Sequence, residues 1–166
     1  MLKNHVTFTL IFIFLLPTRL AAQQSSLDSL KQVLVETSQT EKKAELHRKI
    51  SLIYGRGNPV KGYRHATKAY QLASQSDNQE ELTRSIIQLG QFYIITGQAT
   101  QALQDTLLPL GLKNARQLNL PKALGQAHNY LGSAFARSGQ GDTALYHYDR
   151  SIHILDSLEK KKKKAQ

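Results

Sequence analysis

The chain has 166 residues, which is room for one domain, and 40% of them are hydrophobic. It carries 22 Lys and Arg against 12 Asp and Glu, a formal net charge of +10 at pH 7. It contains no cysteine, which excludes disulfides, thiolate metal sites, a cysteine nucleophile and a lipidated N-terminal cysteine.

Residues 1–22 have the organisation of a secretory signal peptide. Lys3 precedes a mostly apolar 11-residue run, Val6 to Leu16, and Ala22 offers a small residue at the cleavage site. This run is short for a transmembrane helix. We therefore expect a secreted or periplasmic protein with no stable membrane span after cleavage. Two alternatives stay open: an uncleaved anchor, because Leu20 is unfavourable three residues before the cut, and a buried first helix.

Apolar residues recur at helical spacing through the rest of the chain. Within 23–39, the spacing predicts a short amphipathic capping helix over 25–35, followed by a linker. Two helices follow over 40–54 and 60–74, and Asn58 and Pro59 suit the start of the second.

Four further helices are predicted over 79–96, 98–118, 121–138 and 143–160. Pro109 and Gly111 fall inside the second of these, and proline in a helix interior costs about 3 kcal/mol. We therefore expect a kink or break near Leu108. The chain closes with a lysine-rich tail over 160–166.

The helices repeat. Five residues of the last helix pair return in the same order 42 residues earlier: Leu131, Gly132, Phe135, Gly139 and Ala144 correspond to Leu89, Gly90, Tyr93, Gly97 and Ala102. A weaker third copy keeps Gly62 and Ala69. Such a period indicates a solenoid of helical hairpins. We expect Gly132 and Ala144 to lie where two helices cross closely, with Phe135 and Tyr148 filling the adjacent space.

These residues resemble the tetratricopeptide repeat (TPR) family, in three units over about 40–78, 79–120 and 121–159. Unit two departs from the pattern at Thr106 and Pro109, and unit one lacks the Leu-Gly pair. The resemblance implies an all-α, right-handed solenoid of three helical hairpins with an N-terminal capping helix.

The order of segments also resembles something narrower. A signal peptide, an Asp-Ser-Leu-Lys helix, repeats of about 40 residues and a charged last helix resemble the extracytoplasmic TPR sensor region of Bacteroidetes-type histidine kinases and transcriptional regulators. That resemblance implies a sensor fragment of a signalling protein, with a role in signal transduction.

No catalytic motif is present: there is no G-x-S-x-G, P-loop or G-x-G-x-x-G. No two of the five histidines after Ala22 are four residues apart, so a helical metal site is not indicated. We interpret each of them as a surface or hairpin-packing residue: His47, His65, His128, His147 and His153. We expect no enzyme, no metal and no cofactor.

Function is then expected at a surface. In a solenoid of hairpins the first helices line the concave side, and their polar residues outside the core pattern would face a groove for a peptide or protein partner. This candidate set is His47, Ser51, Tyr54, Arg84, Gln88, Gln91, Gln126, Asn129, Ser133 and Arg137. The alternative is a plain solvated face.

The last helix offers a second interpretation. An apolar edge at Ile152, Leu155 and Leu158 would mediate self-association as a homodimer, which would make the chain an assembly element. The five lysines Lys160 to Lys164 are interpreted as a solvated helix end. Binding of this tail to anionic lipid is the alternative, and the expected export argues against nucleic acid.

Overall fold

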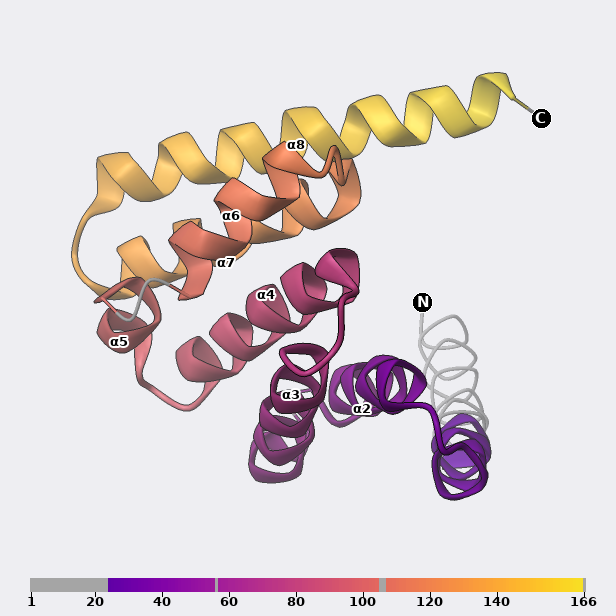
Figure 1. Ribbon diagram of the computed structural model, residues 1–166. Helices are drawn as coiled ribbons and strands as arrows, with labels where there is room; N and C mark the ends of the chain where they lie inside the picture. Colours follow the sequence, from indigo (N-terminus) through magenta and orange to yellow (C-terminus); the bar gives the residue numbers. More distant parts are fainter. Residues whose placement is uncertain (1–23, 56, 105–106, 166) are drawn as a thin grey trace, which may run out of the picture.

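A computed structural model describes residues 24–55, 57–104 and 107–165, and every regular element in these ranges is an α-helix (Figure 1). The expected all-α class is therefore confirmed. The predicted signal peptide, 1–22, lies outside the described residues. Within the described part of the chain, no helix is both long enough and apolar enough to cross a membrane.

The helices pack in sequence order. A first helix over 24–36 agrees with the predicted capping helix, and its Leu27 is buried. The helices that follow form three groups: α2 (Thr40–Tyr54) on α3 (Pro59–Ala73), α4 (Gln79–Ile95) with α5 (Ala99–Gln104) and α6 (Leu107–Gln117), and α7 (Pro121–Arg137) on α8 (Gly141–Lys164). Successive groups join through α3 against α4 and α6 against α7, and α4 also contacts both α2 and α7.

Local sequence fixes where several helices begin and end. The side chain of Asn58 accepts a hydrogen bond from the Lys61 backbone N–H, which caps α3 as predicted. Gly97 and Gly139 follow the first helices of the second and third groups with φ of 87° and 77°, a conformation that disfavours residues with a Cβ. Within two residues of these glycines the next helices begin, α5 at Ala99 and α8 at Gly141.

The small residues that recur in the repeats lie at close crossings between helices. A Cβ added at Gly132 would lie 2.8 Å from the Tyr148 ring, which is the arrangement expected from the sequence. Gly90 meets Leu108 in the same way, within the second group. Gly62 instead faces the ring of Phe92, which belongs to the next group. The glycines thus set spacings both within and between groups.

The second group is divided as the sequence predicted. Its second helix ends at Gln104 as α5, and α6 begins at Leu107, slightly before the expected position. Pro109 is therefore the third residue of α6, where its missing N–H is no loss, because the first four N–H groups of a helix have no intrahelical partner.

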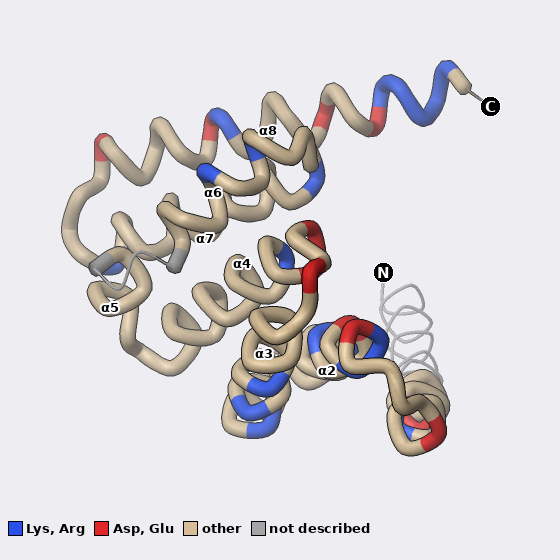
Figure 2. Tube along the Cα trace, viewed as in Figure 1, with Lys and Arg blue, Asp and Glu red and all other residues tan. Residues whose placement is uncertain are grey.

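The last helix is longer than predicted. We expected it to end at about Lys160, but α8 continues through the lysine run to Lys164 (Figure 2). Lysine is a good helix former, and cations at a helix C-terminus interact favourably with its dipole. These last turns are exposed and extend past α7 (Figure 1).

Candidate functional site

The first helices of the three groups present a polar face with three hollows. The central hollow has a volume of about 410 Å³. Its lining comes from α2, from α4 and from the start of α7: Arg48, Leu52, Arg84, Ile87, Gln88, Leu120, Pro121, Lys122, Ala123 and Gln126. Three cations, two amides and several apolar side chains therefore share one depression.

Two further hollows flank the central one. The α4–α7 hollow, of about 470 Å³, is lined by Gln91, Ile94, Ile95, Asn129, Tyr130, Ser133, Ala136, Arg137 and Tyr148. The α2–α4 hollow, of about 410 Å³, is lined by Gln39, Glu41, Lys42, Glu45, Arg48, Asn78, Glu81 and Arg84. Because Arg48 and Arg84 line both this hollow and the central one, these two depressions are contiguous.

Seven of the ten predicted groove residues lie in these hollows. Arg84, Gln88 and Gln126 line the central one, while Gln91, Asn129, Ser133 and Arg137 line the α4–α7 hollow. Their spacing of three or four residues along α4 and α7 places them on one side of each helix. Neighbouring polar groups are bonded: Gln88 Nε2 donates to Gln91 Oε1 at 2.8 Å, and Tyr148 Oη donates to Ser133 Oγ at 3.1 Å.

The three residues predicted from α2 do not line these hollows. Ser51 has no exposed surface, and its hydroxyl donates to the Arg48 carbonyl at 2.7 Å. His47 and Tyr54 instead pack toward α3, where both rings contact His65. The expected helix register was wrong by one residue, because this unit lacks the Leu-Gly pair that aligns the other two. Arg48 and Leu52 occupy the places assigned to His47 and Ser51.

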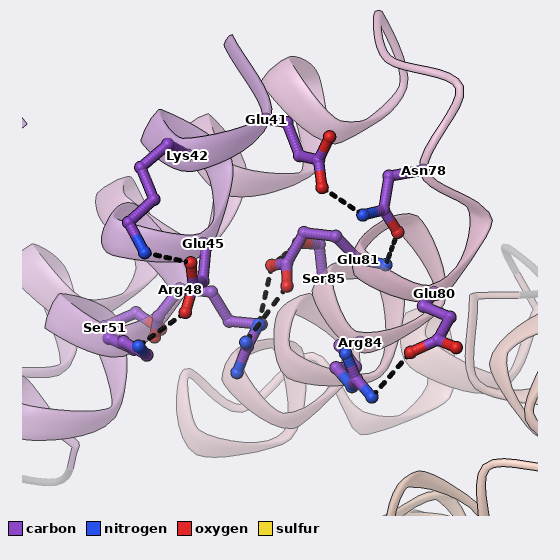
Figure 3. A network of polar contacts seen from close by, with 11 residues as sticks. Glu41, Lys42, Glu45, Arg48, Ser51, Asn78, Glu80, Glu81, Arg84 and Ser85 are labelled. Atoms are coloured by element: carbon purple, nitrogen blue, oxygen red, sulfur yellow. Dashed lines mark hydrogen bonds and ion pairs between the residues drawn. The ribbon is translucent and has the colours of Figure 1, made fainter. Parts of the chain in front are cut away.

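An ion pair joins α2 to α4 beside the central hollow (Figure 3). Arg48 Nε lies 2.7 Å from Glu81 Oε1 and Nη2 lies 3.0 Å from Oε2, a two-point contact. The Glu81 side chain is 5% exposed and that of Arg48 is 16% exposed. Ser85 adds a hydroxyl 3.2 Å from Glu81 Oε1. The two residues are 33 apart in the chain, and residue spacing within a single helix does not predict their pairing.

Two histidine pairs link the helices of the first and third groups. His47 on α2 and His65 on α3 have their Nδ1 atoms 2.9 Å apart, and His128 on α7 and His147 on α8 have theirs 3.0 Å apart. The interpretation as hairpin-packing residues fits these four, but their pairing was missed. A signal existed in the sequence, because the partners are 18 and 19 residues apart in units one and three.

Burial holds the histidine pairs in the neutral form. It lowers the pKa of His47 and of His128 to about 4, and the partner ring and nearby cations act in the same direction. Burial also lowers the pKa of His65, assisted by Lys31, and that of His147. Neutral rings fit the observed contact, in which one Nδ1 donates and the other accepts.

The predicted self-association residues on α8 differ in exposure. Ile152 is 58% exposed. Two other apolar side chains of this helix are also largely exposed, Leu145 at 68% and Tyr146 at 58%. Leu155 packs against α7 at Gly125, and Leu158 is half-buried beside the same helix. The free apolar surface of α8 is therefore centred on Ile152 and Leu145.

In the residues that the structure describes, no three His, Asp or Glu side chains are grouped so that they could hold a metal ion. The side chains that line the polar face can offer hydrogen bonds, positive charge and apolar contacts to a ligand. Comparison with models of protein families found no match, and comparison with curated proteins found none either.

Proposed function

We propose that the chain is an exported, non-enzymatic protein-interaction module. It binds an extended peptide or a segment of a partner protein along the face of α2, α4 and α7. In this proposal the helix groups are three TPR-like hairpins of a right-handed α-solenoid, and that face is its concave groove. The signal peptide directs the chain to the periplasm or outside the cell, where it serves as the sensing part of a signalling system.

One observation supports this binding mode above the others. Side chains from three helices far apart in the sequence line hollows on one polar face, two of them contiguous, and seven predicted groove residues are among them. Amides such as Gln126 and Asn129 can bond both N–H and C=O groups of a peptide backbone. Arg84 and Arg137, in different hollows, would engage acidic groups of the ligand.

The test removes both arginines from the hollows. Peptides selected from a random library for binding to the protein are measured by fluorescence anisotropy, and R84A/R137A should weaken binding about tenfold, or ~1.4 kcal/mol. R64A/K113A removes the same charge from exposed positions that line none of the three hollows, and it should retain binding. Selection of no peptide, or equal affinity of both variants, would count against the proposal.

A second candidate function is self-association through α8. The exposed side chains of Leu145, Tyr146 and Ile152 favour it, because these apolar residues lie within two turns of one another on α8 and are open to a partner. Under this alternative, L145S/I152S should convert a dimer to a monomer in light scattering over a range of protein concentrations. Both side chains are mostly exposed, so the folded protomer should keep its stability. A wild-type protein that is monomeric at all concentrations excludes this candidate.

A further inference from the structure

The two histidine pairs occupy equivalent places in the fold. His47 and His128 are each the eighth residue of their helix, α2 and α7, and His65 and His147 are each the seventh of α3 and α8. The eighth residue of α4 is Ile86, which is 2% exposed. The first and third groups therefore carry a polar, titratable link where the middle group has an apolar side chain.

Geometry fixes the protons of the His128–His147 pair. His128 is 2% exposed, and its Nε2 is buried without a hydrogen-bond partner. A bare nitrogen there is less costly than an N–H without an acceptor, so His128 carries its proton on Nδ1 and donates it to His147 Nδ1. A further proton has two places to go. If the proton binds His128 Nε2, it creates a buried N–H that has no acceptor. If it binds His147 Nδ1, the Nδ1–H groups of the two rings point at each other and repel.

Within the described residues, the side-chain charges that lower the pKa values of these rings, apart from the partner rings, are cations. Lys31, Lys43 and Lys68 act on the His47–His65 pair from the first helix, α2 and α3. Arg116 of α6 and Arg150 of α8 act on His128. Phe135 stacks on His147 with ring centroids 5.3 Å apart. These cations oppose a positive charge on His47, His65 and His128, and burial opposes it on all four rings.

We propose that the two histidine pairs are proton-sensitive latches, which hold α2 on α3 and α7 on α8 while all four rings are neutral. Uptake of a proton by a pair puts a positive charge on a half-buried or buried ring near cations, and in the third group it also leaves an N–H without an acceptor or sets two N–H groups against each other. This cost loosens the helix group that takes up the proton, whereas the middle group stays closed. The residues after the first-helix histidines, Arg48 and Asn129, line the hollows. Acidification therefore also shifts these two lining residues of the polar face. The latch itself does not depend on what that face binds.

The sign of the effect follows from linkage. The paired rings have folded pKa values below the ordinary 6.5, as low as about 4 for His47 and His128. The unfolded or opened state then binds more protons between these two values. The latch contribution is complete above pH 6.5 and is lost as pH falls toward 4.

Hydrogen exchange measured by mass spectrometry at pH 7.5 and 5.0 tests the proposal, with rates corrected for the intrinsic pH dependence. Protection in α2, α3, α7 and α8 should fall on the order of tenfold more than protection in α4 and α6. In H128I/H147L, which introduces the isoleucine of the middle group, α7 and α8 should no longer respond while α2 and α3 still do. H153Q replaces the exposed histidine of α8 and should behave as wild type.

Equal loss of protection in every helix would overturn the proposal, and so would an unchanged response of α7 and α8 in H128I/H147L. If that variant does not fold, NMR titration of the wild-type imidazole Cε1–H signals decides. His47 and His128 must then titrate near pH 4, well below the ordinary 6.5, and titration of either ring at 6.5 or above refutes the latch.

Discussion

Replacing Arg48 with alanine should lower the free energy of unfolding by about 3–5 kcal/mol, the largest effect that we expect from removing one charge. The variant leaves the Glu81 carboxylate, whose side chain is 5% exposed, with the Ser85 hydroxyl as its one remaining side-chain partner in the described part of the chain. The cost is the desolvation of an unpaired anion rather than the lost attraction. Urea denaturation followed by circular dichroism at pH 7.5 measures it.

Two variants make this prediction specific. R84A removes another arginine of the same face, whose ion pair with Glu80 is exposed, so it should change the free energy of unfolding by less than about 1 kcal/mol. The double change R48M/E81L removes both charges and should recover most of the stability lost in R48A. If R48A and R84A have equal effects, the Arg48–Glu81 pair does not hold α2 against α4.

Sequence periodicity was sufficient to predict the helices because their apolar residues recur at helical spacing, although α4, which contacts helices of all three groups, buries residues on several sides. The repeated spacing also predicted the close helix crossing at Gly132, because a glycine that recurs opposite a large side chain such as Tyr148 indicates that two helices approach closely there. The polar residues of α4 and α7 that line the hollows were predicted to share one face for the same reason: the Leu-Gly pair indicates which side of those helices packs inward. Unit one lacks that pair, and the register of α2 was one residue wrong.

Contacts between separate helices were harder to predict. The Arg48–Glu81 ion pair depends on how α2 lies against α4, which residue spacing within one helix does not determine. The histidine pairs depend on the crossing of two helices, and only a comparison of units one and three would have aligned His47 with His128. The recurrence of histidines at equivalent positions of units one and three is the sequence signal for these pairs.

The second large effect concerns the contact between the first two helix groups. Phe92 of α4 has no exposed surface and packs with Ala66 and Leu89. Its replacement by alanine should lower the free energy of unfolding by about 3–5 kcal/mol, because it removes buried apolar contacts and leaves a cavity. Thermal and urea unfolding both report this loss.

Gly62 tests whether that ring sets the spacing of the groups. A Cβ at Gly62 meets the Phe92 ring, so G62A should destabilise the wild type by about 1–3 kcal/mol, although alanine favours a helix by about 1 kcal/mol over glycine. In the F92A background the ring is gone, and the same change should become neutral or stabilising. This reversal of sign in a double-mutant cycle requires direct contact between the two positions. Additive effects would mean that α3 and α4 are held apart by other residues, and that Gly62 is small for a reason unrelated to Phe92.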